Sequence, residues 1–398
     1  MGNSTSTTAD EELEPEVIIQ TPIKVDLKDD DGYVWPKNLY LETRDMASIS
    51  FLIYTFGYAV DVARKVGLKG LQQTNDGQIV HDSTSKEDKK VFDLPRSFTP
   101  DEILQILTDN YDVLSTQYPK IFAKSSSETT TAPADESTSG ETTEELEEES
   151  NYDKIITNLQ AMQERIDEDA QAEGTSIERP LQVVEYDDRH QQHELVYGIT
   201  KDDINKRITL VFRGTDNTLA FGSNWTTNLS MTKTQATIPK LLETVIPPVD
   251  TTSYNGLYTT GGMWIHSGFY NYIFNVTKDE DDPATWRKYD EIVKDLKSVF
   301  DSDPKYSKEY KLYVTGHSLG AALSTVVAFY LACGYSGGSG TDSSESSDEA
   351  AASVVDMSFI PKPITCINFA SPRVGDGNFL NGIQHLEEQG LLRMLRIV

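Results

Sequence analysis

One short segment, residues 310–331, constrains the fold of this chain more than any other. It begins with residues 310–314, an apolar run rich in strand-forming side chains, and ends with residues 321–331, an apolar run long enough for a buried helix. Residues 316–320 between them read Gly-His-Ser-Leu-Gly. The glycines permit a sharp turn where a Cβ atom would clash. The segment therefore predicts a strand, a tight turn and a helix, with the Ser318 hydroxyl exposed on the turn.

A serine on such a turn is placed for nucleophilic catalysis. The N–H groups at the start of the following helix face the same point and can stabilise an oxyanion. The alternative is a glycine-rich start of a helix that carries no chemistry, because a G-x-S-x-G pattern alone is common. The strand pattern before it and the helix pattern after it favour Ser318 as a nucleophile.

Strand and helix patterns alternate along the rest of the chain. Residues 99–102 (Thr-Pro-Asp-Glu) predict a helix start with a capping box, and residues 152–166 show helical spacing. Strand patterns occur at residues 181–186, 194–199, 207–212, 364–370 and 391–398. The second and third of these flank a turn-rich connector, which predicts a hairpin. The alternation predicts an α/β fold with a mostly parallel central sheet that helices cover on both faces.

Composition divides the chain into four segments. We expect an acidic disordered N-terminus at residues 1–35, a helical region at 36–123 and an acidic low-complexity linker at 124–150. The fourth segment, residues 151–398, is the expected α/β domain. It contains a Ser-, Gly- and Asp-rich insert at 336–352, which we also expect to be disordered.

The charge balance and the cysteines limit the partners and the compartment. With 64 Asp and Glu against 35 Lys and Arg, the net charge of −29 argues against nucleic acid and against direct attraction to anionic lipid. Cys333 and Cys366 lie in apolar runs and are expected to be buried thiols, which fits a reducing, cytoplasmic location. No apolar run reaches about 20 residues, so we predict no transmembrane segment, and Ile49–Val66 is expected to be a helix.

The first six residues, Met-Gly-Asn-Ser-Thr-Ser, fit the pattern for N-myristoylation of Gly2. The alternative is a polar tail that happens to begin with glycine. One acyl chain binds a membrane weakly and reversibly, and no polybasic patch follows it. The pattern therefore indicates peripheral membrane contact through a myristoyl group.

Three further segments accompany the serine motif. Residues 210–215 read Leu-Val-Phe-Arg-Gly-Thr, residues 264–269 read Trp-Ile-His-Ser-Gly-Phe, and residues 369–376 read Phe-Ala-Ser-Pro-Arg-Val-Gly-Asp. Together with residues 316–320, and in this order, they resemble the class 3 (fungal-type) lipase family of α/β-hydrolases. The resemblance extends over residues 186–398, and the N-terminal half shows none.

The resemblance implies a role for each matching residue. Ser318 would form the acyl-enzyme, while Thr215 and Leu319 would supply backbone N–H groups to the oxyanion hole. Trp225 would lie in a lid that covers the acyl pocket. His266 matches a non-catalytic position of the family and is expected to be structural.

The residues around Trp225 support a lid independently. Leu219, Phe221, Trp225, Leu229 and Met231 form an apolar set in a polar, glycine-containing stretch. The alternative is that these five side chains simply pack in the core.

Acyl transfer by a serine needs a base and an acid that orients the base. In the family both follow the strand that corresponds to residues 391–398, so the resemblance places them beyond Val398. Asp376 and His385 follow the serine in the right order, but Asp376 falls on a turn and His385 in an expected surface helix. We therefore expect an α/β-hydrolase fold truncated at its C-terminus, with an active enzyme as the parent protein.

The expected activity is hydrolysis of carboxylic esters of lipids, most simply acylglycerols, at a membrane or droplet interface. It would proceed through an acyl-serine and need neither a metal nor an organic cofactor. A phospholipase or galactolipase of the same fold is the nearest alternative. A catalytically silent lipase-like protein that binds lipid or a partner, or a myristoylated membrane adaptor, is the alternative from another class.

Overall fold

The computed structural model describes ten ranges of the chain. They are residues 39–74, 79–81, 97–122, 151–174, 176–188, 195–214, 232–249, 261–278, 285–336 and 356–398. Residues 40–398 belong to one compact unit. The segments 1–35 and 124–150 lie outside the described residues, as does the insert after residue 336, so the expectations for them stay predictions.

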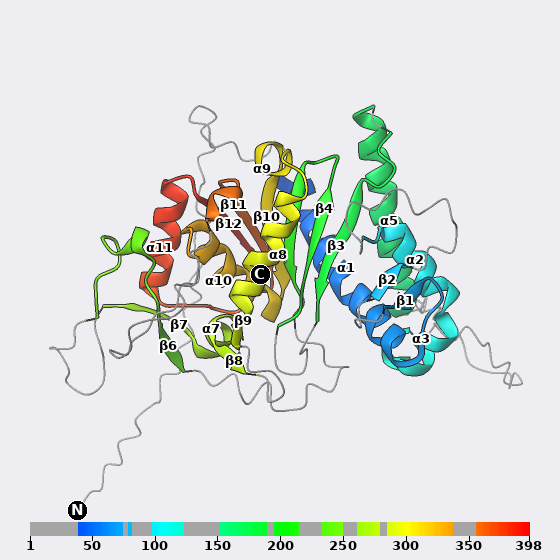
Figure 1. Cartoon of the computed structure of the whole chain (residues 1–398), viewed down its shortest axis with the longest axis horizontal. Coiled ribbons are helices and arrows are strands. Elements are labelled where there is room, and N and C mark those ends of the chain that lie inside the picture. Colours follow the sequence, from blue (N-terminus) through cyan, green and yellow to red (C-terminus); the bar gives the residue numbers. More distant parts are fainter. Residues whose placement is uncertain are drawn as a thin grey trace, which may run out of the picture. The chain divides into compact units, whose positions relative to one another are not determined.

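The centre of this unit is a sheet of six strands in the order β12–β11–β10–β5–β4–β3 (Figure 1). The strands are β3 (Leu181–Asp187), β4 (Tyr197–Asp202), β5 (Arg207–Phe212), β10 (Lys311–His317), β11 (Ile364–Phe369) and β12 (Leu392–Ile397). Neighbours from β5 to β12 pair in parallel, whereas β4 pairs antiparallel with both β3 and β5. The structure thus confirms the α/β class, the mostly parallel sheet and the predicted hairpin.

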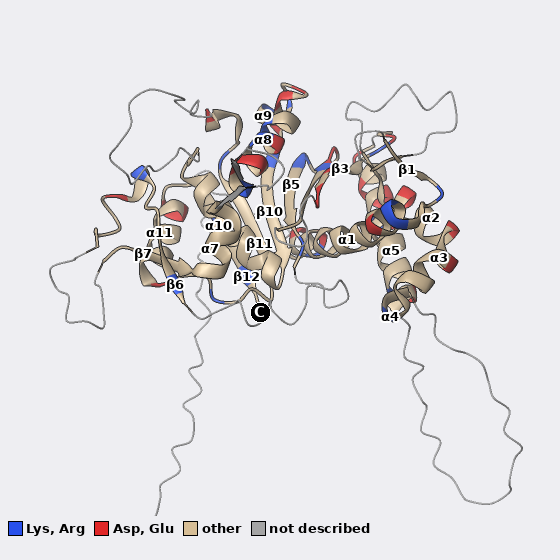
Figure 2. Cartoon of the chain, turned by 60° about the horizontal axis from the view of Figure 1, so that its bottom comes forward, with Lys and Arg blue, Asp and Glu red and all other residues tan. Residues whose placement is uncertain are grey.

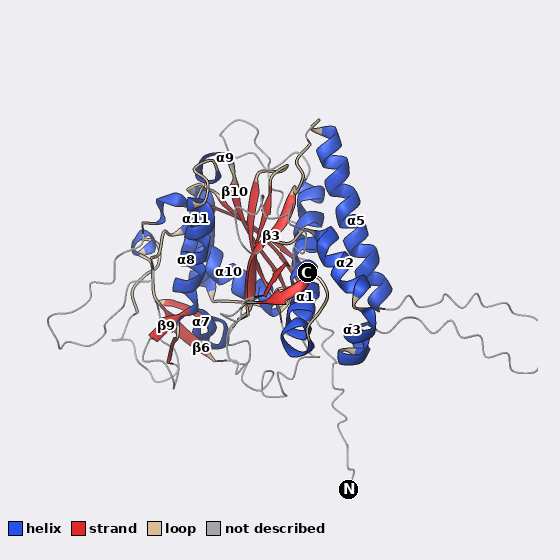
Figure 3. Ribbon diagram, turned by 45° about the vertical axis from the view of Figure 1, so that its right-hand side comes forward, coloured by secondary structure: helices blue, strands red, loops and turns tan. Residues whose placement is uncertain are grey.

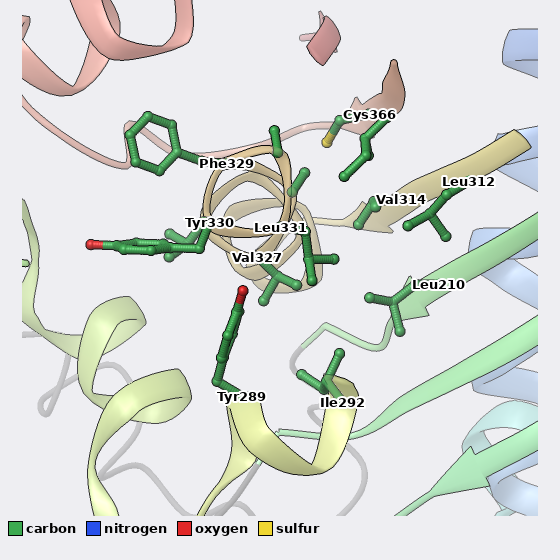
Figure 4. Close-up of a cluster of buried hydrophobic side chains, with 14 of the residues drawn as sticks. Leu210, Tyr289, Ile292, Leu312, Val314, Val327, Phe329, Tyr330, Leu331 and Cys366 are labelled. Carbon is green, nitrogen blue, oxygen red and sulfur yellow. The ribbon is translucent and has the colours of Figure 1, made fainter. Parts of the chain in front are cut away.

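One face of the sheet is covered by α7 (Ser267–Phe274), α8 (Lys288–Asp301), α10 (Leu319–Ala332) and α11 (Gly377–Glu388). All fourteen residues of α10 are buried, which explains its lack of a polar stripe. Figure 4 shows how α8 and the strands surround α10 with apolar side chains, which include Leu210, Tyr289, Ile292, Leu312 and Val314.

The opposite face is covered by the long helix α1 (Leu39–Val66), and α2 (Pro100–Asp109), α3 (Tyr111–Gln117) and α5 (Asn151–Ala172) lie beyond it (Figure 3). Strand alternation sends Val211, Tyr313 and Ile367 to this face. The Ser50 hydroxyl lies 3.1 Å from the Thr315 hydroxyl and ties α1 to β10. The predicted capping box at Thr99 is confirmed, with its side chain and that of Glu102 bonded to each other's backbone N–H.

Helix α1 is longer and more apolar than the sequence analysis predicted. It is the one helix among the described residues with the length and composition to cross a membrane, with a mean hydropathy of 1.4 over its most apolar 18 residues. However, 78% of that window is buried within the protein. The core of residues 40–398 thus accounts for its apolar character.

The remaining elements are short. They are β1 (Leu71–Gln73), β2 (Ile79–His81), α4 (Pro119–Phe122), β6 (Lys233–Ala236), the 3-10 helix η2 (Lys240–Leu242), β7 (Met263–His266), β8 (Val276–Lys278), β9 (Thr285–Arg287), α9 (Tyr306–Glu309) and the 3-10 helix η3 (Met357–Phe359).

Candidate active site

The predicted turn lies at the carboxyl end of β10. Ser318 has φ 55° and ψ −120°, a left-handed conformation that costs a residue with a side chain about 1–3 kcal/mol. Its N–H donates to the Phe369 carbonyl oxygen at 3.0 Å, and its own carbonyl accepts the N–H groups of Ala321 and Ala322. The backbone on both sides therefore holds Ser318 in a conformation it would otherwise avoid. Strand, turn and helix follow each other as the motif predicts.

The two glycines of the motif are needed because backbone approaches them closely. A Cβ atom on Gly316 would lie 2.5 Å from the carbonyl atoms of Gly320. A Cβ atom on Gly320 would lie 2.2 Å from the carbonyl oxygen of Phe212, at the end of β5. Neither neighbour is a flexible side chain that could move aside. The first turn of α10 can therefore pack against β5 only with glycine at these positions.

A buried amide fastens α10 to the next strand. The Asn368 Nδ2 donates to the Thr325 hydroxyl at 2.8 Å, and its Oδ1 accepts from the Ser324 hydroxyl. No charged residue occurs in α10 or β11, and β10 carries only Lys311, at its far end (Figure 2). The low local dielectric strengthens any electrostatic interaction at the turn.

The start of α10 can supply an oxyanion donor. Within the described ranges no acceptor is found for the N–H of Leu319, so it is available to a developing negative charge. Gly214, at the end of β5, lies beside the turn, because a Cβ atom there would be 2.6 Å from the His317 carbonyl oxygen. The other predicted donor, Thr215, lies outside the described residues, as do the lid residues Leu219, Phe221 and Trp225 and the candidate acylation site Gly2.

Two aromatic residues of α1 contact this site, and the sequence analysis missed both. The Tyr54 hydroxyl accepts the N–H of Gly214 at 2.7 Å. The rings of Phe51 and Tyr54 lie 5.7 and 6.4 Å from the His317 ring, between centroids. Burial lowers the pKa of His317 below its ordinary 6.5. The only signal in the sequence is the i, i+3 spacing of two aromatic residues on an expected helix.

The structure does not bring Asp376 and His385 together at the turn. The Asp376 carboxylate caps α11 and accepts the Phe379 N–H at 2.9 Å. His385 lies in the last turn of α11, about 12 Å along the helix from its start. Because α11 runs back from the carboxyl edge of the sheet to the edge where β12 begins, His385 lies toward the edge opposite Ser318.

The remaining candidates have structural roles or none. The His266 Nδ1 accepts the Gly268 N–H at 3.2 Å, and its ring stacks on Phe269 with 4.5 Å between centroids. Burial lowers its pKa as well. Across the described ranges no side chain hydrogen-bonds the Ser318 Oγ, and no cluster of three or more His, Cys, Asp or Glu residues could hold a metal ion.

Comparison with known proteins identifies the segment that contains this site. Residues 209–398 match the family model described as Lipase (class 3). No curated protein matches the chain. Three solved structures similar to it are a mutant form of MDLA from Penicillium cyclopium, a Rhizomucor miehei lipase–propeptide complex and a lipase from Rhizopus microsporus var. chinensis.

These likenesses are distant. The Penicillium cyclopium protein is 22% identical over 54% of this chain and 54% of its own, with a TM-score of 0.31. The Rhizomucor complex is 20% identical over 55% and 49%, with a TM-score of 0.31. The Rhizopus lipase is 19% identical over 55% and 52%, with a TM-score of 0.30. The chain thus spans about half the length of each.

The sequence match, the four motifs and the strained serine between a parallel strand and a buried helix all concern one part of the chain. That part begins within β5 and includes β10, α10, β11, α11 and β12. Residues 209–398, just under half of the chain, are therefore similar in sequence to the class 3 lipase family.

Proposed function

We propose that Ser318 is the nucleophile in the hydrolysis of carboxylic esters of lipids, with acylglycerols as the first substrates to test. The observation that carries the proposal is the strained backbone of Ser318 at the end of β10, within the segment that matches the class 3 lipases. Strain of this kind persists only where the surrounding structure enforces it, and it occurs preferentially at functional sites.

The reaction would begin with attack of the Ser318 Oγ on the ester carbonyl carbon. The carbonyl oxygen would become an oxyanion, which the Leu319 N–H and the N-terminal end of α10 would stabilise. Each such donor contributes about 3–4 kcal/mol to transition-state stabilisation. The alcohol would leave, and water would then release the acid from the acyl-serine.

The Oγ proton must pass to a base. The family resemblance places the acid after the strand equivalent to β12. The carboxyl end of β12 lies at the same sheet edge as Ser318, since β10, β11 and β12 are parallel. Residues that follow this strand in the family would therefore meet the serine at this edge.

A second candidate is a lipid-binding protein that retains the fold without the chemistry. Such a protein needs no base beside Ser318, and in the described part of the chain no side chain hydrogen-bonds the Oγ. A cytoplasmic location with reversible membrane contact through an acylated Gly2 suits either candidate. The two cysteines are free thiols, as such a location requires, although only Cys366 is buried as expected and Cys333 is half-buried.

Labelling with a fluorophosphonate probe distinguishes the two candidates. The protein to label is the product of the full-length transcript, sequenced through its 3′ end. We expect Ser318→Ala to abolish both labelling and hydrolysis of p-nitrophenyl butyrate. Ser358→Ala, at an exposed serine of η3, is the matched control and should change neither. A folded wild-type protein that is not labelled would favour the silent lipid binder.

A further inference from the structure

A cavity of about 470 Å³ lies between α1 and α5, on the sheet face that α10 does not cover. Its volume falls within the range of about 300–1,000 Å³ that is usual for small-molecule sites. Its inner wall is formed by Leu52 of α1 and by Leu159 and Met162 of α5, all of them buried. The inner wall therefore presents mainly apolar side chains to a bound small molecule.

The rim differs from the wall. Asn151, Lys154 and Asn158, near the start of α5, line the cavity and are exposed to solvent. Phe51 also lines it, yet 53% of its surface is exposed, which is unusual for a phenylalanine on a core helix. An apolar interior that opens at an exposed aromatic ring suits a ligand whose greater part is apolar.

One end of the cavity is next to the nucleophile. His317, the residue that precedes Ser318, forms part of the wall. Tyr54 lines the cavity too, and its hydroxyl accepts the N–H of Gly214 beside the turn. Because two side chains belong to both the cavity and the surroundings of Ser318, a chain bound in the cavity would end near the reacting ester.

We propose that this cavity binds the hydrocarbon chain of a lipid ester or fatty acid whose polar end lies toward His317. Apart from His317, the wall residues named here belong to residues 48–162, outside the segment that matches the family. The N-terminal helices therefore supply chain-length selection to a serine that the family segment provides. That the ligand is a substrate rests on the proposed function. That the cavity binds a hydrocarbon chain does not.

Binding is tested separately from catalysis. In the full-length Ser318→Ala protein, calorimetry with octanoate, dodecanoate and hexadecanoate should show affinity rising about fourfold per methylene. The rise should stop at the length that fills the cavity. Ile155 of α5 also lines the cavity, so Ile155→Trp should fill it and weaken dodecanoate binding at least tenfold. Gln160→Trp, at an exposed position on the same helix, should leave it unchanged.

Catalysis then tests the assignment to the substrate. With Ser318 present, Ile155→Trp should lower kcat/KM for p-nitrophenyl dodecanoate at least tenfold and leave p-nitrophenyl acetate unaffected. Thr55→Phe, which fills the cavity from α1, should also lower kcat/KM for the long ester and leave the short ester unaffected. With two independent variants, the test does not depend on the correct folding of either one alone.

The outcomes separate the two proposals. Fatty-acid affinity that is independent of chain length, or unchanged by both filling variants, overturns the cavity proposal even if short esters are hydrolysed. Equal losses for long and short esters overturn it as well. Chain-length-dependent binding in a folded wild-type protein that hydrolyses no ester keeps the cavity and overturns the proposed function.

Discussion

The two faces of the central sheet differ in the side chains that they bury. The face under α10 is packed with aliphatic and aromatic side chains, and α10 has no charged residue. A buried ion pair on this face, between Lys288 and Asp187, belongs to the start of α8 and the edge strand β3 rather than to α10. The face under α1 also has an apolar core, but it encloses a carboxyl group and a guanidinium group. Glu42 and Arg393 are 1% and 3% exposed and lie 3.9 Å apart, and Glu42 accepts from the Tyr313 hydroxyl. Of these three residues only Glu42 lies outside the segment that matches the family, because it belongs to α1.

We infer from this difference that the two faces have different roles. A closely packed apolar face holds the first turn of α10, and with it Ser318, in one position. The other face contains a cavity and buried polar groups, so part of its lining is available to a ligand. We therefore expect substitutions under α10 to reduce stability most, and substitutions under α1 to change both stability and the site.

The largest expected effect is on the α10 face. Phe329 is fully buried, and its ring packs against Phe379 with 4.7 Å between centroids. Phe329→Ala should lower the free energy of unfolding by about 3–5 kcal/mol, because the change leaves a cavity in a dense core. Urea denaturation measures this. Leu380→Ala, at a position on α11 that is 53% exposed, is the control and should cost little. Equal costs at the two positions would contradict the dense packing of this face.

The next effect concerns the charges under α1. Glu42→Gln removes the carboxylate of the buried pair and so the attraction between residue 42 and the Arg393 guanidinium. We expect a loss of about 3 kcal/mol in the free energy of unfolding, measured by urea denaturation. The lower end of the usual range applies, because the amide oxygen can still accept from Tyr313.

The double variant Glu42→Met/Arg393→Met sharpens this test. Two apolar side chains of similar volume need no desolvation of charge, but Glu42→Met also removes the acceptor of the buried Tyr313 hydroxyl. Stability should therefore be higher than that of Glu42→Gln yet about 1 kcal/mol below that of the wild type. A double variant as unstable as Glu42→Gln would mean that the pair itself stabilises the face, and the contrast between the faces would then be smaller than we infer.

The sequence predicts the α10 face better than the α1 face, and the reason is physical. Strand β5 has the predicted bounds, and the turn at Ser318 follows from five adjacent residues whose glycines have a local steric reason. Strand β4 begins three residues later than expected, at Tyr197, because its start is set by pairing with β5. Leu195 and Val196 are buried yet precede the ladder.

The site residues missed by the sequence analysis depend on contacts between distant segments. Tyr54 and Gly214 are 160 residues apart, and no local sequence pattern predicts their hydrogen bond. The cavity depends on how α1 and α5 pack, which hydrophobic spacing cannot specify. The separation of Asp376 from His385 likewise follows from the path of α11, since their order in the sequence alone would allow a pairing.

The Tyr54 hydroxyl provides a smaller and more specific test of the α1 face. Tyr54→Phe removes the acceptor of the Gly214 N–H, which should cost about 1–2 kcal/mol of stability. If α1 positions the end of β5, the rate of fluorophosphonate labelling should fall about tenfold at a temperature where the variant is fully folded. Tyr40→Phe, at a position on the same helix that is 73% exposed, should change neither quantity. A stability loss without a change in rate would limit Tyr54 to a structural role.

The smallest expected effect is a change in protonation at the boundary between the cavity and the turn. Burial lowers the pKa of His317 below 6.5, so the unfolded chain binds a proton more readily than the folded protein does. The contribution of His317 to stability is therefore complete above pH 6.5 and declines as the pH falls from 6.5 through the lowered folded pKa.

Imidazole NMR should show the lowered pKa directly. Phe51→Ala should raise it toward 6.5, because water then reaches the ring. The pKa of His266 is also lowered by burial, but this ring stacks on Phe269, so Phe51→Ala should leave it unchanged. If Phe51→Ala left the pKa of His317 unchanged as well, Phe51 would not shield that ring, and the exposed aromatic residue of α1 would have no part in the environment of the nucleophile.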